Sequence, residues 1–71
     1  MRYRIKVRGL LDPGWSSQLA GMELTHAEED GIPYTLLTGI VADQPALFGI
    51  LDHLRDMNLL PISVLKIDEE E

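Results

Sequence analysis

Residues 38–67, TGIVADQPALFGILDHLRDMNLLPISVLKI, constrain the fold more than any other part of the chain. This segment reads as the end of a strand, a capped helix and another strand. Asp43 is a good N-cap, because its carboxylate can accept a free amide proton of the first helical turn. Pro45 falls within that turn, where a missing N–H costs little. Asn58 suits a left-handed C-terminal position, and Pro61 prevents the helix from continuing.

The helix predicted after the cap carries a single apolar stripe. Its large apolar residues recur at intervals of three and four, which is the spacing of one helical face. These residues are Leu47, Ile50, Leu51, Leu54 and Met57. Burying each of them contributes roughly 1.5–3 kcal/mol, which outweighs a cost of about 1 kcal/mol for Gly49. Phe48 and Gly49 lie outside the stripe, so they either cover an edge of the core or face a partner subunit.

The strand predicted at residues 62–67 is apolar on both faces. Ile62 and Val64 share one face, and Leu65 and Ile67 share the other. A sheet that is covered on one side shows clean alternation of apolar and polar residues. This strand therefore either lies beneath a second layer or meets another copy of the protein.

The first half of the chain begins with the clearest strand in the sequence. Apolar and basic residues alternate there, with Tyr3, Ile5 and Val7 on one face and Arg2, Arg4, Lys6 and Arg8 on the other. Asp12 and Pro13 can then start a short helix that ends at Gly21. Trp15 and Leu19 would lie one turn apart on its inner side. A tight turn followed by irregular chain is the alternative.

Residues 22–26 and 34–41 form a predicted hairpin around the Asp30-Gly31 turn signal, with a loop of about five residues. The resulting order is strand, short helix, strand, strand, long helix, strand. That order predicts an α+β, ferredoxin-like βαββαβ fold with a four-stranded antiparallel sheet. The first and third strands would be central, and the fourth would be an edge strand beside the first. If the short helix fails to form, the fold is βββαβ with one helix.

Size and charge limit the classes of function. The 71 residues form one domain, with an acidic tail at residues 68–71. A chain this short buries only about 60% of its unfolded surface, and it has no cysteine, so good packing or oligomerisation must reinforce it. The net charge of −6 disfavours nucleic acid and anionic membranes as partners. With neither a signal peptide nor a membrane span expected, we predict a cytoplasmic protein.

Residue patterns that carry known chemistry are not found. The sequence has no Gly-rich phosphate loop, no nucleophile-elbow motif and no His-Glu-x-x-His motif. Asp52, His53 and Asp56 share a broad helical face, but nothing fixes a complete set of metal ligands. We therefore expect no catalytic residues, no metal and no cofactor.

The basic first strand is a separate candidate surface. Arg4, Lys6 and Arg8 could hold phosphates on an open sheet, but sheet-based RNA binders also present aromatic side chains, and Tyr3 points the other way. The preferred reading is that these residues are ion-paired, for which the acidic tail could serve across the sheet, or solvated. A protein partner comes second and nucleic acid third.

Two resemblances add to this reading. The first covers nearly the whole chain, and its residues are Leu11-Asp12, Trp15, Gly21-Met22, Leu24-Thr25-His26, Leu37-Thr38-Gly39, Asp43-Gln44, Leu54-Arg55-Asp56 and Ile62-Ser63-Val64. It resembles short conserved bacterial proteins of about 70 residues whose function is unknown, the size of a single small domain. This resemblance implies no particular activity.

The second resemblance covers residues 39–48, GIVADQPALF, which are similar to the first strand–helix junction of ACT domains. Those ferredoxin-like regulatory modules pair and often bind amino acids at the paired interface. Asp43, Pro45 and Leu47 match the ACT pattern, whereas Ala46 replaces its glycine and the junction follows the third strand rather than the first. The resemblance implies a small ligand held near Asp43, Gln44, Pro45 and Ala46.

From these observations we predict a non-enzymatic interaction or regulatory module that associates with itself as a dimer. The predicted interface residues are Phe48, Gly49, Leu65 and Ile67. The alternative is an ACT-like sensor of a small ligand such as an amino acid. An enzyme whose site forms between subunits is a third reading.

Overall fold

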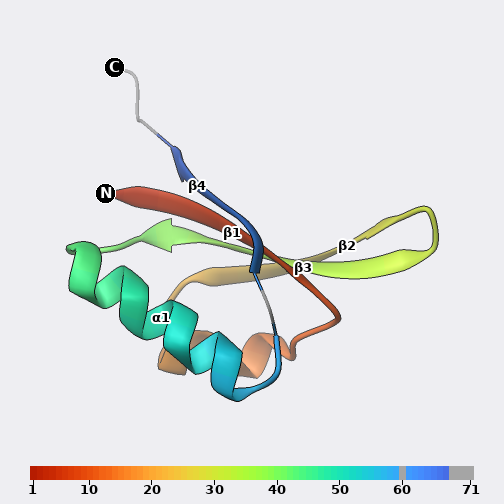
Figure 1. The fold of residues 1–71 in the computed structure, drawn as a ribbon, viewed down its shortest axis with the longest axis horizontal. Coiled ribbons are helices and arrows are strands. Elements are labelled where there is room, and N and C mark those ends of the chain that lie inside the picture. The colour runs from red at the N-terminus through yellow and green to blue at the C-terminus, as the bar shows by residue number, and fades with distance from the viewer. Residues whose placement is uncertain (60, 68–71) are drawn as a thin grey trace.

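A computed structural model describes residues 1–59 and 61–67 of the chain. The elements in order are β1 (Arg2–Arg8), the 3-10 helix η1 (Pro13–Leu19), β2 (Glu23–Glu29), β3 (Ile32–Ile40), α1 (Gln44–Asp56) and β4 (Pro61–Ile67). The fold is α+β, with a four-stranded antiparallel sheet in the order β2-β3-β1-β4. Figure 1 shows η1 and α1 on the same side of this sheet. We call that side the helix face and the opposite side the outer face.

The hydrophobic core lies between the helices and the helix face. Register places one apolar residue from each strand side by side, because Leu37 pairs with both Leu24 and Ile5, and Ile5 also pairs with Val64. The buried apolar residues are Tyr3, Ile5, Val7, Leu11, Leu19, Met22, Leu24, Leu37, Val41, Leu47, Ile50 and Leu54. The alternation in β1 thus directs its apolar residues into this core, as predicted.

Helix α1 begins and ends where its capping residues predict. The Asp43 carboxylate accepts a hydrogen bond from the Ala46 amide at 3.0 Å, and Asn58 adopts the left-handed conformation with φ 62°. Leu54 is fully buried, while Leu51 and Met57 at the margins of the stripe are half-buried. The predicted orientation of the helix is confirmed.

The first helix forms where predicted but as a 3-10 helix. Asp12 caps it by accepting a hydrogen bond from the Gly14 amide at 2.9 Å, and Ala20 ends it in the left-handed conformation. Leu19 is buried, but 37% of the Trp15 side chain is exposed. A 3-10 helix has three residues per turn, so positions four apart do not lie on one side. The prediction that both residues face inward is therefore wrong for Trp15.

The hairpin between β2 and β3 is tighter than predicted. Asp30 and Gly31 alone form the loop, with φ of 54° and 79°. Positive φ at both central residues matches the twist of the flanking strands, which favours a two-residue turn. The strands consequently continue to Glu29 and from Ile32, which pair directly. The predicted loop of about five residues is wrong for this reason.

A buried threonine fixes the loop between β1 and η1. Thr35 on β3 is fully buried, and its hydroxyl accepts from the Leu11 amide at 2.9 Å and donates to the Gly9 carbonyl at 2.7 Å. These bonds direct Leu11 into the core on the helix face. Leu11 therefore packs on the helix face and does not cover the outer face.

Candidate functional site

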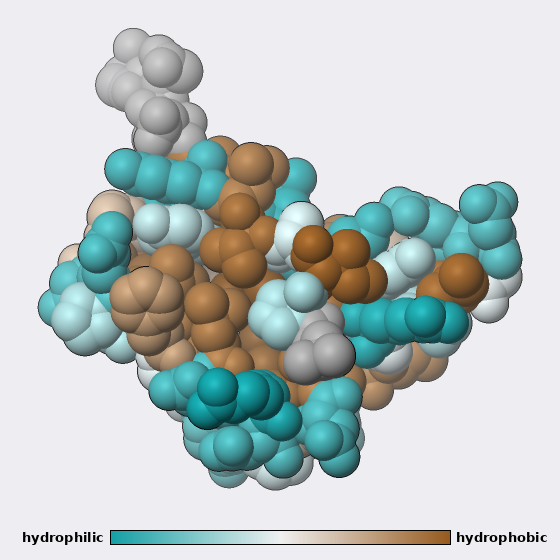
Figure 2. All heavy atoms as spheres, in the orientation of Figure 1, coloured by the Kyte–Doolittle hydropathy of each residue, from teal (hydrophilic) through white to brown (hydrophobic). Residues whose placement is uncertain are grey.

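The most exposed apolar side chains cluster around β4. Val64 points to the helix face yet remains 42% exposed, and Ile62, which lies at the register shift between β1 and β4, is 53% exposed. Val64 lies beside Ile5, which is fully buried, so the helix face is covered less completely at β4 than at β1. Figure 2 shows hydrophobic surface gathered between α1 and β4 in this view. Because β4 is the last strand in the sheet order, one of its edges has no neighbouring strand within the described residues.

The four predicted interface residues lie on two sides of the sheet. Phe48, which is 58% exposed, and Gly49 are on the solvent side of α1. Leu65, which is 56% exposed, and the half-buried Ile67 point to the outer face. No single flat contact can reach both pairs, so only a contact that wraps around the β4 edge could include them all.

Gly49 provides a simple test of its place in such a contact. Its position is open, and an added Cβ would meet no atom within 4 Å. We expect Gly49→Ala to raise the free energy of unfolding of the isolated chain by about 0.5–1 kcal/mol, because Ala costs less backbone entropy in a helix. Urea denaturation at low protein concentration measures this gain. A gain at low protein concentration that turns into a loss as the protein is concentrated would show that a second chain approaches Gly49 closely.

The outer face carries the basic row of β1. Arg4 lies between Thr38 on β3 and Leu65 on β4. The Lys6 Nζ lies 4.4 Å from the centre of the Tyr34 ring and 3.0 Å from the Glu29 carboxylate. Lys6 thus reaches across β3 to an acidic residue on β2. The predicted partner of the basic row, the acidic tail at residues 68–71, lies outside the described residues.

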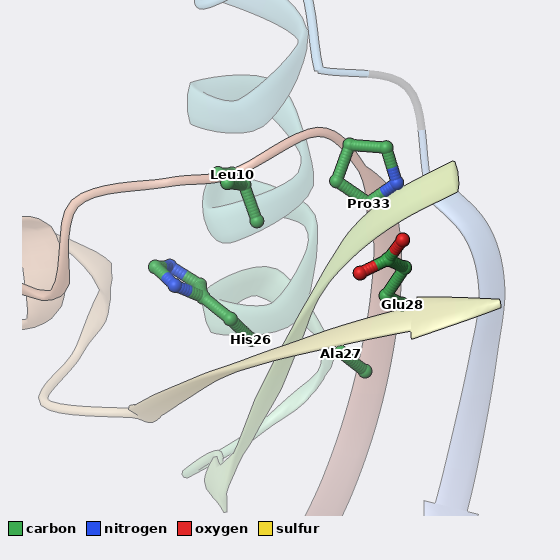
Figure 3. Close-up of a pocket in the computed structure, with 5 residues that line it drawn as sticks. All are labelled: Leu10, His26, Ala27, Glu28 and Pro33. Carbon is green, nitrogen blue, oxygen red and sulfur yellow. The ribbon is translucent and has the colours of Figure 1, made fainter. Parts of the chain in front are cut away.

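A hollow of about 310 Å³ lies on the helix face near the β2–β3 hairpin, lined by Leu10, His26, Ala27, Glu28 and Pro33. Figure 3 shows His26 and Leu10 approaching each other from the strand and from the loop. His26 Nε2 lies 2.8 Å from the Leu11 carbonyl. A carbonyl can only accept, so Nε2 carries the proton in this contact. His26 therefore assists Thr35 in holding the loop.

Asp43, Gln44, Pro45 and Ala46, the predicted ligand residues, lie together at the start of α1. The first three are exposed and Ala46 is half-buried. The Asp43 carboxylate is engaged as the helix cap. Across residues 1–59 and 61–67, no group of three or more His, Asp or Glu side chains is placed to share a metal ion.

Comparison with known families identifies the chain. It matches a family described as a domain of unknown function, DUF8691, over residues 2–65. The chain belongs to the DUF8691 family. No curated protein and no solved structure is significantly similar to it. Neither helix in the described part of this DUF8691 domain is long and apolar enough to cross a membrane.

Two features of the DUF8691 surface were missed from the sequence. Tyr34 shares the outer face with the basic row, because it pairs with Arg8. Counting alternate residues along β3 would have placed it there once the register was known. Val64 lies on the helix face, because it pairs with Ile5, but the sequence did not show that Val64 and Ile62 stay exposed.

The Asp43 cap predicts a measurable loss on mutation. We expect Asp43→Ala to lower the free energy of unfolding by about 1 kcal/mol, because the Ala46 amide loses its acceptor. Thermal and urea denaturation measure the loss, and Asp43→Ser, which retains a capping oxygen, is the matched control. If the alanine variant keeps its stability while Asp43→Ser does not, the capping role assigned to Asp43 is incorrect.

Proposed function

We propose that this DUF8691 domain is a non-enzymatic interaction module that associates with a second copy through the edge of β4. The observation that carries the proposal is that β4 is an edge strand with large aliphatic side chains exposed on both faces. Exposed edges normally carry charges, prolines or bulges that prevent pairing. β4 has such features at its start, where Pro61 and a register shift against β1 interrupt regular pairing, but between Val64 and Ile67 the one charged residue is Lys66, and Val64 and Leu65 remain exposed.

A twofold arrangement accounts for these exposed groups. Antiparallel pairing of β4 with the same strand of a second copy would give hydrogen-bond partners to the free edge of both strands. The contact would bring Val64 of the two copies together on the helix face and would set Leu65 beside the added strand on the outer face. An 8.0 kDa chain has little core of its own, so added burial at β4 contributes a large share of stability.

We also infer that the domain is a ferredoxin-like fold with a shortened first helix. The strand order with β1 and β3 in the centre supports this classification. The long helix α1 connects β3 to β4, and η1 takes the place of the other helix between β1 and β2. Such a sheet leaves β4 at an edge, where pairing between copies needs no rearrangement.

The rival function is an ACT-like sensor with a small ligand at the start of α1. The sequence pattern of residues 43–46 favours it. Asp43 is already engaged as the cap, which leaves fewer polar groups for a ligand. A thermal-shift screen against amino acids and nucleotides tests this rival, since a ligand that binds only the folded state raises the melting temperature. If no compound in the screen raises it, the sensor reading fails.

One pair of variants tests the β4 contact. Val64→Lys places like charges opposite each other at the centre of the proposed pair, so we expect the dimer dissociation constant to rise about tenfold or more. Thr25→Lys is the matched control, because Thr25 is exposed on β2, the opposite edge strand. Native mass spectrometry over a dilution series measures both constants, and circular dichroism verifies folding. If the two variants have equal dimer dissociation constants, or if Thr25→Lys raises the constant more than Val64→Lys does, the assignment of the interface to β4 is overturned.

A further inference from the structure

The outer face of the sheet is more apolar than a solvated sheet face. A sheet covered on one side presents mainly polar residues to water on the other. β3 is a central strand here, yet four of its five outward residues are Ile32, Tyr34, Leu36 and Ile40, with Thr38 between them. Ile40 is 71% exposed. β4 adds Leu65 and Ile67 on the same face.

The basic row of β1 runs between these two apolar rows. Arg4 lies beside Leu65, and Arg8 lies beside Tyr34. Both arginines are exposed, whereas Lys6 is engaged by Glu29 and the Tyr34 ring. Within the described residues, the outer face is covered by no helix (Figure 1). The face therefore combines aliphatic contacts with two guanidinium groups that can each form paired hydrogen bonds to a carboxylate.

We propose that the outer face binds an acidic amphipathic helix supplied by another protein. A helix is the element that covers the open face of a sheet in layered folds. Its apolar stripe would lie over Leu36, Ile40 and Leu65. Acidic residues beside that stripe would pair with Arg4 and Arg8. The site lies on a protein of net charge −6, so the basic row selects acidic partners locally although the whole chain repels them.

Other occupants fit this face less well. Single-stranded nucleic acid needs several aromatic side chains for stacking, but Tyr34 is the one aromatic residue on the outer face of the described strands, and Lys6 lies over its ring. A second copy stacked face to face would bring the two basic rows towards each other. The helix binds neither the β4 edge nor its backbone groups, so this proposal does not depend on self-association.

An unbiased selection tests the proposal. The full chain is immobilised and panned with a phage library of random peptides of about 18 residues, long enough for five helical turns. We expect the enriched peptides to be acidic, with apolar residues at helical spacing, and to gain helical circular dichroism on binding. Their affinity should fall as salt is raised, because exposed charge pairs are screened. Enrichment of basic or unpatterned peptides, or no enrichment, would overturn the proposal.

Variants locate the binding face. The double variant Arg4→Glu/Arg8→Glu should bind the selected peptides at least about tenfold more weakly, because attraction is replaced by repulsion. Arg55→Glu is the matched control, since Arg55 is an exposed arginine on α1. Equal weakening by both would place the peptides elsewhere and overturn the proposal. Tighter binding of a uridine oligonucleotide or of phosphatidylserine vesicles than of any selected peptide would also overturn it, in favour of those partners.

Sedimentation of the same double variant separates this proposal from the previous one. Arg4 and Arg8 lie on β1, which is an inner strand, so their reversal should leave any β4-mediated dimer intact. If this variant loses peptide binding while its mass in solution is unchanged, the outer-face site is supported and is separate from any contact between copies. Loss of the dimer in this variant would instead show that copies meet through the outer face, which would contradict the proposed occupant.

Discussion

Leu54→Ala is expected to lower the free energy of unfolding by about 2–5 kcal/mol. Leu54 is fully buried at the centre of the α1 stripe and belongs to the core cluster beneath the sheet. Truncation removes apolar contacts and leaves a cavity, because the close-packed core around Leu54 can relax only partially into the space. Urea denaturation followed by circular dichroism measures the change.

A second variant on the same helix provides the matched control for Leu54. Leu51 is half-buried at the margin of the stripe, so Leu51→Ala removes the same atoms from a site already open to water. The free energy of unfolding should therefore fall clearly less for Leu51→Ala than for Leu54→Ala. A loss below about 1 kcal/mol for Leu54→Ala, or equal losses for the two variants, would mean that α1 packs on a different side.

The second large effect is expected at Thr35, where valine has nearly the same shape but no hydroxyl. Thr35→Val leaves the Leu11 amide and the Gly9 carbonyl without the partner that now bonds both. An unsatisfied buried group costs about 1–3 kcal/mol, so we expect a loss in that range. The loop between β1 and η1 should also exchange its amide hydrogens faster, as hydrogen–deuterium exchange would detect.

Thr38→Val is the matched control for this effect. Thr38 lies on the same strand but points to the outer face, where water can reach it. We expect a change within about 0.5 kcal/mol, typical of surface substitutions. If Thr35→Val has no larger effect than Thr38→Val, the hydroxyl does not hold the loop.

Much of the fold follows from local sequence signals. The alternation of residues 2–8 predicts which side of β1 is buried, and the Asp43 cap and Asn58 predict both ends of α1. These signals succeed because each depends on one residue's conformation or on a simple period. The 3-10 geometry of η1 and the two-residue turn at Asp30 and Gly31 depend instead on how neighbouring strands extend and pair.

The surface features depend on three-dimensional coverage. The sequence predicts that β4 is apolar on both faces, but not that Ile62 and Val64 remain exposed. It also does not bring Tyr34 beside the basic row, since that needs the β1–β3 register. The start of α1 was predicted as a ligand site from its residue pattern, and a helix cap uses the same residues. The β4 edge and the outer face therefore became specific candidate surfaces only once the sheet order was known.

Sedimentation equilibrium of the wild-type chain at a few micromolar tests self-association most directly. We expect a mass of twice the 8.0 kDa of one chain, because β4 exposes aliphatic side chains on both faces and, among the described residues, lies at the edge of the sheet. The measured mass should fall towards that of one chain as the protein is diluted, and it should stay at twice that mass as the protein is concentrated. A mass of one chain that does not change as the protein is concentrated would contradict the β4 contact and the function built on it.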